Sequence, residues 1–530
     1  MTHPAPDAWL GIDLGTQGVR AVATDSAGQL LGAGTAPLTS DRRDGRHEQD
    51  PDEWWRAVCA AVGQARAAGA DPRRIRAVAV DATSGTVTLT DRHGHTVTPA
   101  LMYDDGRAAV EAEKVNEAGE AQWTRAGYRR MQRSWGLPKL RWLLDRHPRA
   151  AADGWRLAHQ SDVVNRRLVG HDVPTDTSNA LKTGADAATV TWPEKVFADL
   201  GIPAEVLPGL VPPGTVLGEV SAAAAAETGL LAGTPVVAGM TDGCAAQLGS
   251  GATAVGSWNS VMGTTLVLKG VTAELVHDPA GVMYSHRSPA GTWLPGGASS
   301  VGAGLVAREF AGADLDRLTA GAAELLPTGL LRYPLVSPGE RFPFVAPGAT
   351  AFRSREPAGS AEDFAALLQG AAYVERLCFD YADLLGAPAT GAVVLTGGAT
   401  RNPVWNQLRA DVLRRPVTLP RHAQPALGMA VLAAAALDGT GDGDRIGNGS
   451  GTGTGSGPDS GSGTAAGSPA AGGALDRAAA AMVRADRTVE PRDPYRSAHD
   501  EGYVRLVDLL ARRGWLPEVV AAHARERTAS

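Results

Sequence analysis

Short apolar runs, separated by Gly, Pro or charged residues, extend along the whole chain. The first run, at residues 9–14, leads into a Gly-Thr-Gln-Gly turn at residues 15–18, and a second follows at residues 19–24. Two such runs joined by a tight turn predict a β-hairpin. The carboxylate of Asp13 would then lie beside the backbone N–H groups of the turn. Such a turn can hold phosphate oxygens while the carboxylate holds magnesium through water.

The same pattern returns in the second half of the chain. The apolar run Trp258–Met262 is followed by Gly263, Thr264 and Thr265, and residues 266–268 are apolar again. A single Gly-Thr turn is as consistent with a plain hairpin as with a phosphate site, because short motifs often occur by chance. The second copy favours phosphate binding and predicts a duplicated architecture.

Two further apolar strands end in residues that can take part in chemistry. Residues 236–240 lead to Asp242 and a run of small residues that predicts the start of a helix. Asp242 can cap that helix, or it can accept the proton of a hydroxyl that attacks a phosphate. Residues 393–395 lead to Gly397 and Gly398, which allow a flat ligand to approach the backbone, although paired glycines after a strand are equally often structural.

Residues 50–55 predict the start of a helix. Asp50 suits the N-cap, Pro51 suits the first helical position, and Glu53 is placed to complete a capping box by reaching back to Asp50. Trp54 and Trp55 follow. We expect these two side chains to pack in a core and not to bind a ligand, since large aromatic residues dominate core burial.

Residues 439–473 consist almost wholly of Gly, Ser, Thr, Ala and Asp. This composition has too few apolar side chains to offset the entropy of ordering, so it predicts a disordered insertion. Helical patterns resume at residues 474–483 and 503–513. The insertion is therefore expected to interrupt a folded domain and not to separate two domains.

Composition narrows the class of protein. The 530 residues are 44% hydrophobic, but no run approaches the roughly 20 apolar residues of a membrane-spanning helix. A net charge of -7 without a basic stripe argues against a nucleic-acid partner. Three widely spaced cysteines predict reduced thiols, and the first residues lack the basic and apolar pattern of a signal peptide. We expect a cytoplasmic protein with no membrane partner.

Taken in order, the motifs resemble the FGGY family of carbohydrate kinases over nearly the whole chain apart from the insertion. Each match is weakly specific, and the ordered set is strongly specific. The matches are residues 11–16 (GIDLGT), 48–51 (EQDP), 103–107 (YDDGR), 175–180 (TDTSNA), 242–243 (DG), 262–265 (MGTT) and 397–399 (GGA) with Asn402.

The resemblance implies an α/β fold of two ribonuclease H-like domains, of the actin and hexokinase ATPase type, around an interdomain cleft. Residues 1–249 would bind the sugar, and residues 250–530 would bind ATP. The activity implied is transfer of a phosphoryl group from ATP, with Mg²⁺, to an alcohol group. A homodimer is one candidate assembly, which the residues do not decide.

The resemblance also assigns roles to single residues. Asp242 matches the general base, in contact with the sugar, and Asp13 matches the magnesium-associated carboxylate. The nucleotide-binding positions that match are Gly15, Thr16, Gln17, Gly263, Thr264, Thr265, Gly297, Gly398 and Asn402.

The identity of the sugar depends on the loop at residues 81–86 (DATSGT). D-xylulose kinases of the family carry Met-His-Gly at this place, so the loop argues against D-xylulose. Thr83 and Ser84 are candidate sugar contacts, although hydroxyls after a strand also bond to their own backbone. Asp105 is a third candidate contact, and Arg107 either holds Asp105 in place or touches the sugar itself.

Residues 102–107, 262–270, 284–287 and 293–299 also look more like the D-ribulokinase branch. We therefore predict phosphorylation of D-ribulose to D-ribulose 5-phosphate. The alternatives are D-xylulose, another sugar or a polyol.

Three other classes of protein share parts of this pattern. Chaperones and filament proteins use the same ATPase scaffold without a base on the sugar side, and fold alone does not decide function. A sugar-binding regulator could keep the scaffold without catalysis, although the intact Asp13, Asp242 and both turns argue against it. A dehydrogenase would need a glycine-rich turn that opens a helix, whereas the turn at residues 15–18 opens a strand.

Overall fold

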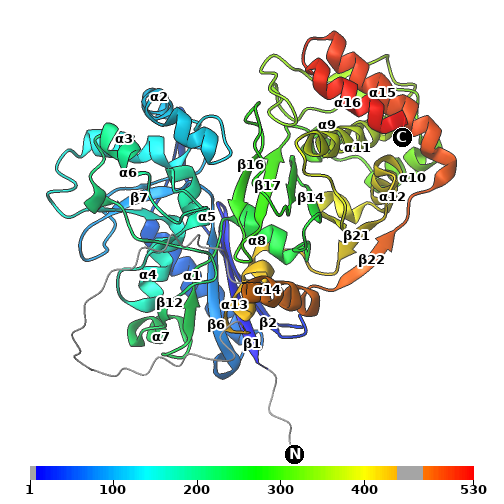
Figure 1. The fold of residues 1–530 in the computed structure, drawn as a ribbon. Helices are drawn as coiled ribbons and strands as arrows, with labels where there is room; N and C mark the ends of the chain where they lie inside the picture. The colour runs from blue at the N-terminus through cyan, green and yellow to red at the C-terminus, as the bar shows by residue number, and fades with distance from the viewer. Residues whose placement is uncertain (1–6, 439–468, 530) are drawn as a thin grey trace, which may run out of the picture.

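A computed structural model describes residues 7–438 and 469–529, which form two lobes (Figure 1). The N-terminal lobe is built on a six-stranded sheet of order β12-β13-β6-β1-β2-β3, and the C-terminal lobe on a seven-stranded sheet of order β16-β17-β15-β14-β20-β21-β22. The strands of the first sheet are β1 (Ala8–Leu14), β2 (Gly18–Asp25), β3 (Leu30–Pro37), β6 (Ile75–Ala82), β12 (Val216–Glu219) and β13 (Pro235–Val237). Those of the second are β14 (Trp258–Met262), β15 (Leu266–Gly270), β16 (Tyr284–Arg287), β17 (Trp293–Ala298), β20 (Val393–Thr396), β21 (Val417–Pro420) and β22 (Ala485–Val489).

The two sheets repeat one arrangement. In the first, β1 pairs antiparallel with β2 and parallel with β6, and β6 pairs parallel with β13. In the second, β14 pairs antiparallel with β15 and parallel with β20, and β20 pairs parallel with β21. Both predicted hairpins are therefore confirmed, and so is the duplicated, ribonuclease H-like architecture.

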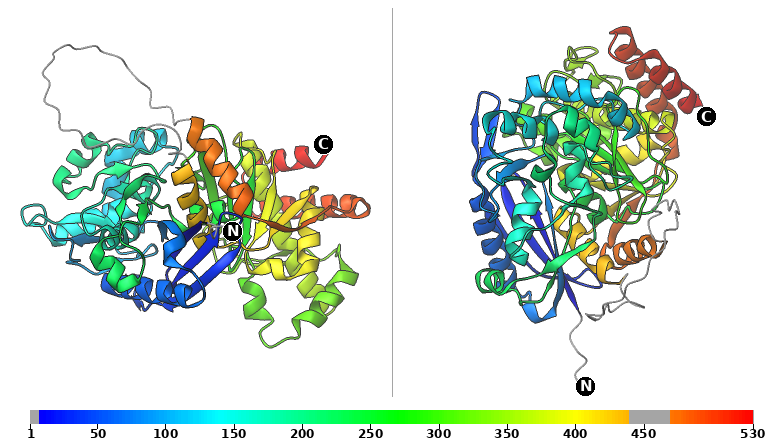
Figure 2. Two further views of the ribbon diagram at one scale, coloured as in Figure 1. Left: turned by 90° about the horizontal axis from the view of Figure 1, so that it is seen from below. Right: turned by 60° about the vertical axis from the view of Figure 1, so that its left-hand side comes forward.

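The remaining elements cover the sheets or extend the lobes (Figure 2). A smaller sheet of the N-terminal lobe contains β4 (Asp41–Arg43), β5 (Arg46–Gln49), β8 (Ala100–Leu101), β7 (Val87–Thr90) and β9 (Arg156–His159). Two-stranded pairs join β10 (Thr175–Asp176) to β11 (Leu210–Val211) and β18 (Arg332–Tyr333) to β19 (Phe352–Arg353). The helices of the N-terminal lobe are α1 (Pro51–Ala67), α2 (Ala109–Arg125), α3 (Gly136–Arg146), α4 (Gln160–Val169), α5 (Thr177–Ala180), α6 (Glu194–Asp199), α7 (Ala222–Thr228) and α8 (Asp242–Gly249). Those that follow are α9 (Gly304–Glu309), α10 (Leu315–Leu325), α11 (Ser360–Leu384), α12 (Pro403–Leu413), α13 (Pro425–Asp438), α14 (Pro469–Met482), α15 (Arg496–Arg512) and α16 (Glu518–Ala529).

Helix α1 begins as predicted, with one correction. The carboxylate of Asp50 accepts from the backbone N–H of Asp52 at 3.0 Å, and Pro51 is the first helical residue. Glu53 does not complete a capping box, because the end of β3 brings Thr39 within its reach. The Glu53 carboxylate accepts from the backbone N–H and the hydroxyl of Thr39. Trp54 is fully buried, so its predicted packing role is confirmed.

The C-terminal lobe contains a fully buried ion pair. Arg409 of α12 donates to Glu375 of α11 at 2.7 Å, and neither side chain is exposed. Ser260 of β14 donates to the same carboxylate at 2.6 Å. The three groups tie both helices to the strand that leads to the turn at residues 263–265.

Helix α13 comes late in the chain but packs on the sheet of the N-terminal lobe, and α14 packs on α13, near the centre of the molecule in Figure 1. Their apolar side chains form one buried cluster with Trp9, Ala79 and Val237. Helix α8 lies against α13, and a Cβ added to Gly428 would lie only 1.9 Å from the backbone oxygen of Ala245. This α8–α13 contact therefore depends on glycine.

We expect Gly428→Ala to lower the free energy of unfolding by about 1–3 kcal/mol, because the added methyl group forces the two helices apart. Differential scanning calorimetry measures the effect. The matched control is Gly63→Ala in α1, where an added Cβ meets no atom within 4 Å. That control should be neutral or slightly stabilising, since alanine favours a helix. Equal melting temperatures for the two variants would contradict the α8–α13 contact.

The predicted insertion lies mostly outside the described residues, at positions 439–468. Its last five positions, 469–473, form the first turn of α14 and correct the predicted boundary. Pro469 suits the first helical position, because its missing N–H needs no partner there. Within the described ranges, no helix combines the length and apolar character that crossing a membrane requires.

Candidate active site

Three neighbouring parallel strands of the N-terminal lobe bring carboxylates together. Asp13 of β1 is the register partner of Asp81 of β6. The next strand, β13, leads to Thr241, which forms a β-bridge with Ala82, and Asp242 follows as the first residue of α8. The carboxyl ends of parallel strands meet at one edge of a sheet, where ligands of α/β proteins bind. Asp13, Asp81 and Asp242 thus form a carboxylate row at that edge.

The carboxylate row has little positive charge close to Asp13 and Asp81. Burial and the nearby Asp242 raise the pKa of Asp13 to about 6, although Arg20 lies 3.7 Å away. Asp81 is fully buried, and within the described chain no amide, ammonium or hydroxyl donor bonds to its carboxylate, whose hydrogen-bond neighbour is the carboxyl group of Asp13. Burial and Asp13 raise the pKa of Asp81 well above its usual value. A cation near Asp13 would relieve this repulsion.

The side chains near the turn at residues 15–18 indicate how magnesium would bind. No group of three or more acidic, His or Cys side chains among the described residues is arranged to hold a metal ion. Magnesium usually keeps several waters and binds one or two carboxylates together with phosphates of the substrate. Asp13 fits that mode, because it adjoins the turn at residues 15–18.

Two lysines act electrostatically on Asp242. Its Oδ1 accepts from the backbone N–H of Gly243 at 2.7 Å, while Thr241 occupies the N-cap position. Burial raises the pKa of Asp242, and Lys182 and Lys269 oppose that rise. Lys182 belongs to the short 3₁₀ helix Leu181–Thr183 of the N-terminal lobe, and Lys269 belongs to β15 of the C-terminal lobe. The arrangement keeps a proton acceptor beside two positive charges.

Neither lysine forms an ion pair with a carboxylate at salt-bridge distance in the described chain. Lys182 donates to the backbone oxygen of Ser84 at 3.3 Å, and Lys269 donates to that of Leu294 at 3.4 Å. Both ammonium groups can therefore face a phosphoryl group in transfer. Sequence reasoning missed these residues. The signal for Lys269 was a charged side chain in the apolar strand directly after a Gly-Thr turn.

The backbone supports both Gly-Thr turns. In the first, Gly15 donates to the backbone oxygen of Gly18 at 3.1 Å, and Gln49 donates to that of Thr16 at 2.7 Å. Gln17 is exposed at the tip of this turn. In the second, the N–H groups of residues 303 and 304 donate to the backbone oxygens of residues 263 and 264. These bonds hold the turns rigid and leave their hydroxyl groups available.

Gly302, which sequence reasoning missed, packs against the second turn. A Cβ added to Gly302 would lie 2.4 Å from the backbone oxygen of Thr264, and Thr265 is equally close. Gly297 lies elsewhere. It sits inside β17 opposite Leu268, and an added Cβ would strike the ring of Phe342. The structure thus gives Gly297 a packing role and brings Gly302 to the turn.

The paired glycines after β20 lie close to the second turn. Gly397 has a φ of +89°, and an added Cβ would lie 2.6 Å from the backbone oxygen of Met262, so only glycine fits. Gly398 begins the 3₁₀ helix Gly398–Arg401. Asn402 then caps α12 by accepting from the N–H of Trp405 at 3.0 Å. The Oδ1 of Asn402 is committed to this cap, and its Nδ2 donates to the hydroxyl of Thr319 at 3.0 Å.

The two candidate sugar-contacting hydroxyls of the loop at residues 81–86, those of Thr83 and Ser84, differ in their surroundings. Thr83 is buried, and its hydroxyl bonds to Gln160 and Thr86, both at 2.6 Å. The buried hydroxyl of Ser84 has no hydrogen-bond partner within the described ranges. An unpaired buried hydroxyl is costly unless a ligand satisfies it. Ser84 therefore has the freer hydroxyl for a ligand.

Asp105 is fully buried, and its carboxylate accepts from two backbone N–H groups and from a guanidinium; one of the two is the backbone N–H of Arg107, at 3.2 Å. The backbone N–H of His47 donates at 2.9 Å, and the guanidinium of Arg107 donates through both Nε and Nη2. Arg107 also donates to Glu48 at 2.6 Å. Of the two roles left open for Arg107, the structure shows the support of Asp105.

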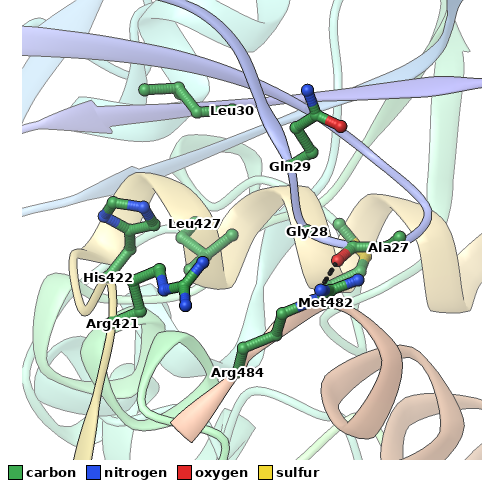
Figure 3. Close-up of a pocket in the computed structure, with 9 residues that line it drawn as sticks. All are labelled: Ala27, Gly28, Gln29, Leu30, Arg421, His422, Leu427, Met482 and Arg484. Atoms are coloured by element: carbon green, nitrogen blue, oxygen red, sulfur yellow. Dashed lines mark hydrogen bonds between the residues drawn. The ribbon is translucent and has the colours of Figure 1, made fainter. Parts of the chain in front are cut away.

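A separate hollow of about 360 Å³ lies between the lobes. Figure 3 shows its lining by the turn at residues 27–30 and by Arg421, His422 and Arg484, whose Nε donates to the backbone oxygen of Ala27 at 3.0 Å. The hollow lies at the far end of β2 from the turn at residues 15–18. Because β2 has eight residues, its two ends lie roughly 25 Å apart. The hollow contains none of the three carboxylates and is therefore separate from the candidate active site.

Comparison with known proteins places the chain in a family. The model for the FGGY family of carbohydrate kinases, N-terminal domain, matches residues 8–249, and the model for its C-terminal domain matches residues 258–437. The chain belongs to the FGGY family of carbohydrate kinases. It is therefore a sugar kinase, and kinases of this family use ATP.

Several relatives cover most of this FGGY kinase. A xylulose kinase of Streptomyces rubiginosus is 31% identical over 81% of this chain and 88% of its own. An autoinducer-2 kinase of Yersinia pseudotuberculosis is 31% identical over 83% of this chain and 89% of its own. The crystal structure of xylulose kinase from Rhodospirillum rubrum is 27% identical and covers 95% of this chain and 98% of its own, with a TM-score of 0.79. The expected two-domain, actin-like ATPase fold is confirmed.

Proposed function

We propose that this FGGY kinase phosphorylates D-ribulose to D-ribulose 5-phosphate with MgATP, in the cytoplasm. Residues 1–249 would bind the sugar and residues 250–530 the nucleotide. The observation that carries the choice of sugar is the loop at residues 81–86, which lacks Met-His-Gly and presents the unpaired hydroxyl of Ser84. D-xylulose is the second candidate, because two of the relatives are named xylulose kinases.

Asp242 performs the proton transfer in this proposal. The attacking hydroxyl of the sugar gives its proton to the Asp242 carboxylate as its oxygen bonds to the γ-phosphorus, and the bond from that phosphorus to ADP breaks. Lys182 and Lys269 stabilise the charge of the phosphoryl group, and Asp13 would hold magnesium through water. Magnesium neutralises phosphate charge when bound. Contact between the lobes excludes water, which would otherwise accept the phosphoryl group.

A coupled assay for ADP formation tests the proposal over pentuloses, hexuloses, pentitols and glycerol. We expect the highest kcat/KM with D-ribulose. A preference for D-xylulose or another acceptor would overturn the choice of sugar and keep the kinase. If the purified protein phosphorylated none of these compounds yet still bound sugar, the regulator without catalysis would replace the proposed enzyme.

A further inference from the structure

The helix that carries Asp242 is fixed at its start by a serine of another segment. The hydroxyl of Ser178, in α5, accepts from the backbone N–H of Thr241 at 3.2 Å and lies 3.3 Å from the Thr241 hydroxyl. Ser178 is fully buried. Thr241 is the N-cap of α8 and directly precedes Asp242, so Ser178 helps, together with the β-bridge from Thr241 to Ala82, to fix where the proton acceptor lies.

The second partner of Ser178 comes from the other lobe. His286 lies in β16, at the edge of the sheet of the C-terminal lobe, and its Nδ1 is 3.1 Å from the Ser178 hydroxyl. The side chain of His286 is only 2% exposed. Burial, together with Lys269 and Lys182, lowers its pKa well below the usual value. A hydrogen bond between two neutral groups therefore joins the lobes directly behind the start of α8.

Other side chains cross between the lobes at the same place. The rings of Trp135 and Tyr284 lie 5.3 Å apart, and the ammonium of Lys182 lies 5.8 Å from the Tyr284 ring. Tyr284 belongs to β16, as His286 does, whereas Trp135 and Lys182 belong to the N-terminal lobe. Separation of the lobes would withdraw His286 and Tyr284 from Ser178, Trp135 and Lys182 together.

A serine hydroxyl has one proton to donate and two lone pairs that accept. With His286 in place, the proton can go to Nδ1 while a lone pair accepts the N–H of Thr241. Without His286 the hydroxyl is free to choose among three staggered rotamers, and the Thr241 hydroxyl competes for it. The start of α8 then loses a defined anchor.

We propose that His286 is a positioning residue, which acts through Ser178 and Thr241 to hold Asp242 in its working position only when the lobes are in contact. Contact between the lobes and the placement of the proton acceptor thus become one event. A displacement of about 1 Å at a reacting group can cost on the order of 100-fold in rate. The proposal rests on Asp242 as the base of the proposed kinase reaction, and it does not depend on which sugar is used.

The first test compares two buried histidines in the same lobe, with the sugar that the wild-type protein phosphorylates. We expect His286→Ala to lower kcat about 10- to 100-fold with the KM for ATP within about twofold, and His286→Asn, whose amide can replace Nδ1, to restore most of kcat. The control is His499→Ala. His499 is equally buried and lies in α15, and its ring forms a hydrogen bond of 3.4 Å with Tyr373. The His499→Ala variant should lose thermal stability and keep the wild-type kcat.

The second test asks whether His286 acts through Ser178. Ser178→Ala should lower kcat by a similar factor, and the double variant should lose no more than either single variant, because the two residues act in series. Amide hydrogen exchange at residues 241–243 should accelerate in both single variants and not in His499→Ala.

Two results would overturn the inference. One is a wild-type kcat in His286→Ala with the same loss of thermal stability as His499→Ala. The other is fold-losses for His286→Ala and Ser178→Ala that multiply in the double variant. Failure of the proposed function would appear elsewhere, as a wild-type protein that does not phosphorylate D-ribulose, so the two failures are distinguishable.

Discussion

Asp242→Asn is expected to lower kcat by roughly 10²- to 10⁴-fold, the usual contribution of a general base. The amide keeps the shape of the side chain and can still accept the 2.7 Å hydrogen bond from Gly243, but it cannot take a proton. ADP formation, measured with the best sugar of the wild-type protein, gives kcat and KM. The KM values should change little, since the substitution removes a function of the transition state.

The matched control is Asp314→Asn, at the start of α10. Asp314 is also an aspartate at a helix start and accepts from the backbone N–H of Arg317 at 3.0 Å, but it is exposed. This variant should keep the wild-type kcat. If Asp242→Asn kept more than a tenth of the wild-type kcat, Asp242 would not be the base.

The pH dependence of kcat gives an independent check. Only ionised Asp242 accepts a proton, so activity is present above its pKa and falls as the pH drops through that pKa. Burial raises the pKa of Asp242 above the usual value for aspartate. We therefore expect the acid limb of the profile at a higher pH than an ordinary aspartate would give. Asp242→Asn should remove the contribution of Asp242 to that limb and leave the contribution of Asp13, whose pKa is raised to about 6.

Arg409→Met is expected to lower the free energy of unfolding by about 3–5 kcal/mol. The substitution leaves the fully buried carboxylate of Glu375 with Ser260 as its remaining side-chain donor in the described structure. An unpaired buried charge costs more than the pair contributes. Urea denaturation followed by circular dichroism measures the effect.

The double variant Arg409→Met with Glu375→Met separates charge from packing. It removes both charges and fills the space with apolar side chains, so it should recover much of the lost stability. A single variant that lost less than about 1 kcal/mol would show that solvent reaches Glu375. A double variant less stable than Arg409→Met would show that packing, and not charge, decides the effect.

Features encoded within one short segment could be predicted from the sequence. Both hairpins and the helix start at Asp50 depend on residues that are adjacent in the chain, and the structure has them where they were expected. The capping box failed for the opposite reason, because Thr39, 14 positions away, competed for Glu53. The surroundings of Gly297 could not be predicted for the same reason, because the ring that it faces belongs to Phe342, which is distant in the sequence.

The surroundings of the carboxylate row could not be predicted, because they come from distant segments. Asp13 and Asp242 were visible as carboxylates at strand ends, but their neighbour Asp81 stood out only once β1 and β6 were paired. The link from His286 to Ser178 spans 108 positions and crosses between the lobes. No local pattern encodes such a pairing.

The position of α13 has a consequence for synthesis of the chain. The strand β13 ends at Val237, and the helix that covers its sheet begins only at Pro425, 188 positions later. A ribosome that adds about 5–20 residues per second needs on the order of 10–40 s for that distance. During this interval Trp9, Ala79 and Val237 have no cover from α13. Part of the apolar surface of the nascent N-terminal lobe thus stays uncovered until the C-terminal lobe is nearly complete.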